Sequence, residues 1–298
     1  MVIWYNDEKW NGEKLMSNGS IINRIEGILD DLPKSEKKIG QAVLANPEFT
    51  TTASIHKLAQ QADASGAAVV RFCKSIGLQS FPELKRQLSL DLVKPQKKGY
   101  YDIEPNEDFH TITEKLVSNM IQTMNDTASQ LNETKILEAC DLLGDADTIY
   151  TYGVGASWLV AEDISQKWLR AGKHVLATQD AHVLAMAFAT GKKRAVFIAI
   201  SNSGETSEVL QLVEQAKLNH VLVISLTRFG HNKLKEQADL SLETSRAPEA
   251  EIRSTATSSR QAQLLVVDIL FYYYASHHYD EMIEQIKQSR EATNRFRE

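Results

Sequence analysis

The sequence is poor in cysteine and lacks long apolar runs, and each shortage excludes a class of protein. Its 298 residues include two cysteines, Cys73 and Cys140, and eight scattered histidines. With no CxxC pair or Cys/His cluster, neither a disulfide framework nor a metal site is expected. No run of 18 apolar residues occurs, so no membrane span is predicted. Residues 1–16 lack the apolar core of a signal peptide, and the expected location is the cytoplasm.

Charge is distributed unevenly along a chain whose formal net charge is −6. Residues 1–98 contain 14 Lys and Arg against 11 Asp and Glu, whereas residues 99–298 contain 19 against 28. The basic excess is concentrated in residues 65–98, which hold seven basic and two acidic side chains. A basic segment on an acidic protein is typical of a nucleic-acid-binding module, although a solvated surface helix has the same composition.

The apolar pattern of residues 17–93 predicts a helical domain. Apolar residues recur there at helical spacing, and Ser35 is expected to cap a helix over residues 36–45. Further short helices are expected over 52–61 and 65–76. Residues 1–16 are expected to be an extension, with Met16 as an alternative start, and residues 94–107, rich in Pro, Gly and Lys, are expected to form a linker.

From Thr148 onwards the pattern changes to strand-length apolar runs that alternate with helix-length segments. This alternation predicts a five-stranded parallel sheet with helices on both faces, so the fold class is α plus α/β. The α/β domain is expected to span residues 108–298, with its core at about 138–277. The expected strands are 148–152, 174–177, 194–200, 220–226 and 240–242, and the last expected helix is 260–277.

Residues 55–74 (IHKLAQQADASGAAVVRFCK) have the pattern of a helix-turn-helix motif. Ser65 offers an N-cap for the second helix, and its hydroxyl and the first-turn amides can face a DNA phosphate. Such a helix can enter the major groove and contact bases. A helical hairpin that only packs is the alternative, and Cys73 is expected in the core. The candidate DNA-binding residues are Ser65, Gly66, Ala67, Ala68, Val70, Arg71 and Lys74.

Residues 58–88 (LAQQADASGAAVVRFCKSIGLQSFPELKRQL) resemble the DNA-binding domain of RpiR-family transcriptional regulators. The resemblance includes the turn at Gly77 and the Phe-Pro-Glu-Leu start of the next helix. Asp63 stands where the family usually has Gly, but Asp tolerates left-handed geometry, so the turn is expected to form. Gly66 and Ala68 also depart from the family. The missing hydroxyl at Ala68 is expected to weaken a phosphate contact or alter site preference.

Two loops that follow expected strands contain glycines and hydroxyls. Residues 151–157 read TYGVGAS, and residues 201–206 read SNSGET. Hydroxyls and backbone amides at the start of a helix bind an oxyanion without needing Lys or Arg. The first loop also resembles a dinucleotide fingerprint, but its third glycine is missing, and glycines that serve only as turns are another alternative. The loop 201–206 follows a strand end, where α/β sheets bind ligands.

GVGAS, SNSGET and TSSRQAQL (257–264) together resemble the SIS domain, a module that binds phosphosugars, over about residues 130–275. That resemblance implies a sugar-phosphate ligand and no cofactor. It also implies that Glu251 and, less directly, Arg253 contact the sugar. The implied phosphosugar-binding residues are Gly155, Ala156, Ser157, Ser201, Asn202, Ser203, Thr206 and Glu251.

The sequence leaves three functions open. The favoured one is a regulator whose affinity for double-stranded operator DNA is set by a sugar phosphate and which controls genes of carbohydrate or amino-sugar metabolism. An isomerase or etherase needs a positioned base, for which Glu205, Glu251 and His182 are candidates, although Glu205 is expected to face solvent in its helix's first turn. The third is a DNA-binding protein whose SIS domain only dimerises. Fusion of the two motifs favours the regulator.

We expect the regulator to be a homodimer or homotetramer, because proteins of this build bind pseudo-palindromic DNA. Two segments can supply the contacts between subunits. These are residues 108–131 and the last helix, which carries Leu264, Leu265 and Phe271. For the last helix, packing inside its own domain is the favoured interpretation.

Overall fold

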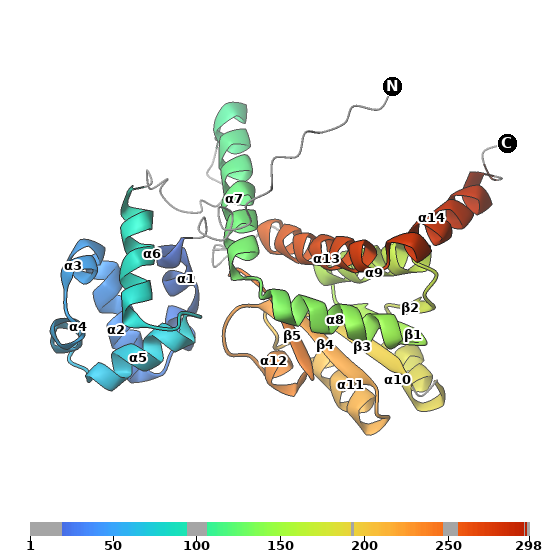
Figure 1. Ribbon diagram of the computed structural model, residues 1–298, viewed down its shortest axis with the longest axis horizontal. Coiled ribbons are helices and arrows are strands. Elements are labelled where there is room, and N and C mark those ends of the chain that lie inside the picture. Colours follow the sequence, from blue (N-terminus) through green and yellow to red (C-terminus); the bar gives the residue numbers. More distant parts are fainter. Residues whose placement is uncertain (1–19, 94–105, 192–193, 247–255, 295, 297–298) are drawn as a thin grey trace.

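The computed structural model describes residues 20–93, 106–191, 194–246, 256–294 and 296. Within these ranges a helical domain and an α/β domain lie side by side, with the long helix α7 (Phe109–Gln130) at their junction (Figure 1). The expected extension 1–16, most of the expected linker, and both Glu251 and Arg253 lie outside the described residues. No described helix is long and apolar enough to cross a membrane.

The helical domain packs six α-helices and one short 3-10 helix around a single apolar core. Ile39, Leu58 and Phe72 are fully buried in this core, and so is Cys73, as its sequence context predicts. Burial raises the pKa of the Cys73 thiol to about 12, so the thiol stays protonated. The elements are α1 (Ile21–Ile28), η2 (Leu29–Asp31), α2 (Lys34–Ala45), α3 (Pro47–Thr52), α4 (Ile55–Gln61), α5 (Gly66–Ser75) and α6 (Phe81–Val93).

Two sequence predictions in this domain are wrong. Ser35 does not cap α2, because the helix already begins at Lys34 and Pro33 occupies the N-cap. The expected helix over 52–61 is interrupted between α3 and α4, where Ser54 caps α4 by accepting a hydrogen bond from the Lys57 amide at 3.3 Å. In both cases a residue that favours helix starts lies near the boundary, and the prediction chose the wrong one.

The α/β domain is built on the predicted five-stranded parallel sheet, with strand order β2-β1-β3-β4-β5. Every residue of β3 is buried, and alternate side chains point to opposite faces, as strand geometry requires. The elements are α8 (Glu133–Asp145), β1 (Thr148–Gly153), α9 (Ala156–Arg170), β2 (Val175–Ala177), α10 (Ala181–Thr190), β3 (Ala195–Ile200), α11 (Ser207–Leu218), β4 (Leu222–Arg228), α12 (Lys233–Gln237), β5 (Leu240–Thr244), α13 (Ser258–His277) and α14 (Tyr279–Asn294).

Helices cover both faces of the sheet (Figure 1). The core on one face joins Ile198 to side chains of α8, α9 and α13, and the core on the other joins Phe197 to α10, α11 and α12. Leu270 of α13 is buried in the first core, and Leu264 and Phe271 pack against it, which supports the intradomain interpretation of this helix. The sequence did not predict α14 as an element.

The order of the strands determines where a ligand can enter. From β1 the chain first adds β2 on one side and then β3 on the other, so β1 and β3 are neighbours whose following connections diverge. Crevices at such switch points are the ligand sites of open α/β sheets. The loop after β1 contains Gly155, and the loop after β3 begins at Ser201. The two loops that the sequence singled out therefore share one edge of the sheet.

Candidate functional sites

The turn between α4 and α5 has the geometry that its sequence predicts. Asp63 adopts a left-handed conformation, with φ of 46°, in the place where glycine is the easier residue. Its carboxylate pairs with Lys38 on the surface, and this cation lowers the pKa of Asp63. Ser65 caps α5, because its hydroxyl accepts a hydrogen bond from the Ala68 amide at 3.2 Å.

Most of the predicted DNA-binding residues form one accessible face of α5. Ala67, Val70, Arg71 and Lys74 are exposed at helical spacing, and Ser65 is exposed just before them. Gly66 is half-buried, with open space where a side chain would lie.

Ala68 is a correction to the DNA-binding prediction, because this residue is fully buried with Val69 and Phe72. Once Ser65 caps the helix, the phase of α5 turns position 68 inward. A hydroxyl at this position would enter the apolar core, so its absence removes no surface contact with DNA.

Arg71 has a partner that sequence reasoning missed. Its Nε atom lies 3.5 Å from Oε1 of Glu36, whose side chain is 5% exposed. Ser75 donates a second hydrogen bond of 2.7 Å to the other carboxylate oxygen of Glu36. A buried carboxylate needs such partners. Glu36 therefore restrains Arg71 on the surface of α5, while the Arg71 side chain stays 56% exposed.

The loop from Ser201 to Thr206, here called the phosphate loop, brings three hydroxyl groups together. The Oγ atom of the nearly buried Ser201 lies 2.8 Å from Oγ1 of Thr206 and 3.5 Å from Oγ of Ser203. Thr206 occupies the N-cap of α11, yet its side chain makes no capping bond to that helix. Its hydroxyl is therefore directed to the other two. Hydroxyls that converge at a helix N-terminus suit an oxyanion.

The chain holds the phosphate loop tightly at Gly204. This residue has φ of +70°, and a Cβ atom there would lie 2.0 Å from Oδ1 of Asn232. The Gly204 amide donates to Oγ of Ser201 at 3.1 Å, while its carbonyl accepts from the Leu234 amide at 3.0 Å. Only glycine meets both the conformational and the steric requirement at this position.

The loop after β1 lies across the crevice from the phosphate loop. Gly155 has φ of +60° and precedes α9, and a Cβ on Gly153 would lie 2.6 Å from the Ser157 carbonyl oxygen. Ala156 and Ser157 line the same cavity as Ser201, Asn202, Ser203 and Thr206. The structure therefore brings six of the eight predicted phosphosugar-binding residues to one cavity. Gly155 adjoins it, and Glu251 lies outside the described residues.

Helix α13 completes the cavity with residues that the sequence prediction did not select. The cavity has a volume of about 200 Å³, and α13 contributes Ser259, Arg260 and Gln263 to its lining. Gln263 is 2% exposed, and its amide nitrogen has no hydrogen-bond partner among the described residues. Buried polar groups are almost always paired, so this donor points to a ligand. Their segment, TSSRQAQL, was noticed, but no contact was assigned to it.

Glu205 does not behave as the sequence predicted. It precedes α11 rather than lying in its first turn, and its carboxylate accepts a hydrogen bond of 3.0 Å from the Lys233 amide. The Lys233 ammonium lies 2.9 Å from the other carboxylate oxygen, and these bonds lower the pKa of Glu205. A carboxylate held in this way is a weak base. No group of acidic, Cys and His residues in the described chain is arranged to hold a metal ion.

Comparison with known proteins matches both halves of the chain. Residues 19–95 match the family model described as the helix-turn-helix domain of the rpiR family, and residues 142–273 match the SIS domain model. The HTH-type transcriptional regulator YbbH of Bacillus subtilis is 39% identical over 273 residues, which cover 92% of this chain and 96% of YbbH. HexR of Escherichia coli, also an HTH-type transcriptional regulator, is 28% identical over 93% of this chain and 96% of its own length.

Among solved structures, Vibrio vulnificus NanR has the same fold. It is 23% identical, with a TM-score of 0.59, and covers 93% of this chain and 98% of its own. The accessible face of α5, the cavity at the switch point and the extent of the match to YbbH agree with one another. The chain belongs to the RpiR family of helix-turn-helix transcriptional regulators and carries a SIS domain as its second part.

Proposed function

We propose that a sugar phosphate binds in the cavity between the phosphate loop and α13 and sets the affinity of the protein for operator DNA. The observation that carries this proposal is the convergence of the Ser201, Ser203 and Thr206 hydroxyls at the start of α11. Gln263 and Arg260 face the same space from the opposite side. Together they offer hydroxyl, amide and guanidinium donors, which match a phosphate and a sugar.

The size of the cavity and the ligands of two neighbours favour a phosphorylated monosaccharide. About 200 Å³ accommodates a small ligand but not a dinucleotide. The NanR structure is a complex with ManNAc-6P, and a second protein of the same fold, c3406 of Escherichia coli CFT073, was solved in complex with arabinose 5-phosphate. Both ligands carry one phosphate on one sugar. Control of carbohydrate or amino-sugar genes follows as the proposed role.

The chemistry of the candidate bases favours a sensor over an isomerase or etherase. Glu205 is held by Lys233, which favours its ionised form and reduces its basicity. His182 lies exposed in the first turn of α10 and does not line the cavity. Attachment to a DNA-binding domain gives ligand binding a use that needs no chemical step.

For DNA contact, the proposal assigns the exposed face of α5. Its cations Arg71 and Lys74 suit phosphates or base edges, and exposed Ser65 lies at the start of the helix. Binding to chromosomal DNA is in keeping with action in the cytoplasm. We propose a homodimer or homotetramer, with the exposed apolar side chains of α7 covered by a second copy. That apolar face consists of Phe109, Ile112, Leu116, Val117 and Ile121.

A thermal-shift screen tests the proposed effector. The sugar-phosphate panel contains glucose 6-phosphate, N-acetylmannosamine 6-phosphate, N-acetylglucosamine 6-phosphate, N-acetylmuramic acid 6-phosphate and arabinose 5-phosphate. At least one member should raise the melting temperature of the wild type. The double variant S203A/T206A should lose the shift, because each hydrogen bond to a charged phosphate contributes about 1.5–3 kcal/mol.

Ser65→Ala is the matched control, since it removes a hydroxyl at a helix start in the other domain. It should keep the full shift. A double variant that still responds like the wild type would remove the phosphate loop from the account.

A further inference from the structure

Phe229 connects the α/β domain to the core of the helical domain. It follows β4, in the short connection to α12, and its side chain packs against the apolar core of the helical domain. At the turn after α5, a Cβ on Gly77 would lie 3.6 Å from Cζ of Phe229. Phe229 therefore touches the turn that joins α5 to α6. A shift of this ring bears directly on how α5 is held.

The chain on either side of Phe229 is bonded to the phosphate loop. The Arg228 amide donates to the Asn202 carbonyl at 3.1 Å, and the Leu234 amide donates to the Gly204 carbonyl at 3.0 Å. The Lys233 amide donates to the Glu205 carboxylate at 3.0 Å. Residues 228–234, here called the coupling segment, therefore follow any movement of the phosphate loop.

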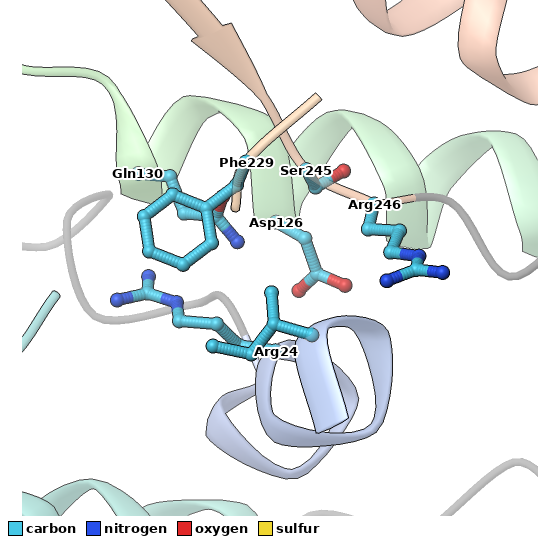
Figure 2. A pocket seen from close by; sticks show the side chains of 7 residues that line it. Arg24, Asp126, Gln130, Phe229, Ser245 and Arg246 are labelled. Atoms are coloured by element: carbon cyan, nitrogen blue, oxygen red, sulfur yellow. The ribbon is translucent and has the colours of Figure 1, made fainter. Parts of the chain in front are cut away.

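The remaining contacts between the domains are polar. The Ser20 amide donates to Oδ1 of Asp126 at 2.7 Å, and Arg246 donates to Oδ2 of Asp31 at 2.8 Å. Figure 2 shows Phe229 beside Arg24 at a small cavity that Asp126 and Arg246 also line. Its volume of about 10 Å³ suits a single water.

Within the described residues, two buried atoms at this cavity lack a hydrogen-bond partner. They are Nε of Arg24 and Oε1 of Gln130. Unpaired buried polar atoms reduce the stability of a contact. Polar interfaces between domains favour relative motion. This contact is therefore suited to shift between two arrangements.

Ligand binding must change the bonds inside the phosphate loop. Oγ of Ser201 accepts from the Gly204 amide, and Oγ of Ser203 accepts from the Glu205 amide at 3.2 Å. A phosphate competes for these amides and for the hydroxyl protons, because a charged acceptor forms the stronger bond. The carbonyls of Asn202 and Gly204 lie between the exchanged groups and carry the change into the coupling segment.

We propose that Phe229 is the coupling residue of this regulator, whose displacement, when an anion fills the phosphate loop, loosens the contact between the helical and α/β domains. The inference rests on the proposed function, since it needs a phosphate-bearing ligand in that loop. The described arrangement includes the loop's internal bonds, so a ligand that replaces them favours a different arrangement. It shifts the balance only by its differential affinity for the two.

Hydrogen exchange on the full-length protein tests this coupling. The probe is the panel member that gives the largest thermal shift, at saturation. In the wild type, the amides of residues 76–84 should exchange about threefold faster or more with the probe, because Phe229 releases the turn at Gly77. In Phe229→Ala they should exchange fast already, and the probe should add little. The thermal shift should remain, because Phe229 does not line the ligand cavity.

Leu218→Ala is the matched control, because it also truncates a large apolar side chain of the same domain, one that is exposed at the end of α11. It should behave like the wild type. Phe229→Leu keeps an apolar contact and should retain part of the response, which separates lost coupling from a folding defect.

The outcomes separate this inference from the proposed function. If the probe binds but Phe229→Ala keeps the wild-type change in exchange, the coupling inference is overturned and the proposed function stands. The same holds if the probe binds to the wild type and exchange at residues 76–84 does not change. If no panel member binds to the wild type, the proposed function fails, and the inference fails with it.

Discussion

The start of α5 and the start of α11 are built from similar residues, yet they suit different ligands. Each has serine and glycine near the N-terminus of a helix. At α5, the Ser65 hydroxyl caps its own helix, and the residues around it are exposed. At α11, the Thr206 hydroxyl makes no capping bond and instead meets the nearly buried Ser201.

The difference shows how burial, more than composition, determines what a helix start can bind. The exposed face of α5 suits an extended polyanion, to which charge and shape are presented along a surface. The phosphate loop faces a cavity closed by α13, where a single oxyanion is surrounded and desolvated. Three substitutions can break or sharpen this comparison.

The largest expected effect is on stability at Gly204. In Gly204→Ala, the new Cβ would lie 2.0 Å from Oδ1 of Asn232, which caps α12 by accepting from the Lys235 amide. Displacing that cap, together with a φ of +70° that alanine tolerates poorly, should lower the free energy of unfolding by about 3 kcal/mol.

Gly66→Ala at α5 is the matched change, because no atom lies within 4 Å of its Cβ position. It should alter the free energy of unfolding by less than about 1 kcal/mol. Urea denaturation measures both variants. Equal losses would mean that the two glycines have the same role, against the comparison.

The second expected effect is on DNA affinity. Arg71→Ala should weaken operator binding by about tenfold or more, because a cationic contact to a base edge contributes about 1–3 kcal/mol. Fluorescence anisotropy, with a duplex selected from a random library, measures this affinity. The thermal shift by the bound sugar phosphate should be unchanged.

Lys74→Ala separates DNA contact from the support that Arg71 gives to buried Glu36. It should reduce DNA affinity and its salt dependence by about one phosphate contact without lowering stability. Unaltered DNA affinity in both variants would show that α5 is not the recognition helix.

The smallest expected effect is at Gln263. In Gln263→Met, effector affinity should fall about tenfold, because one hydrogen bond to a charged or polar ligand is lost. Stability without effector should stay the same or rise, since the buried amide nitrogen has no partner among the described residues. Calorimetry measures the affinity. A variant that loses stability but binds effector normally would make Gln263 a structural residue.

The sheet and the phosphate loop were predictable because their signals are local. Parallel strands are buried on both faces, so β3 is a continuous apolar run, and SNSGET follows it directly. The contribution of Gln263 was not predictable in this way. It lies about sixty residues from the loop, and only the packing of α13 beside the sheet brings them together. Glu36 was missed for the same reason, because tertiary contact alone pairs it with Arg71.

The errors in the helical domain have a different cause. Helix phase depends on which residue is the cap, and once Ser65 is the cap, Ala68 faces inward. The sequence also offers several candidate caps near Ser35 and Thr52, which differ little in propensity. Helix α14 was not predicted because it carries many charged side chains and buries only Met282. Its weak apolar pattern gives little signal.

Operator affinity, measured with and without a saturating sugar phosphate, tests the central claim most directly when the wild type and S203A/T206A are compared. The account predicts that the effector changes operator affinity of the wild type by about fivefold or more, and that the double variant binds the operator equally well with and without it. A double variant with the full wild-type response would contradict the claim that the phosphate loop is the sensor.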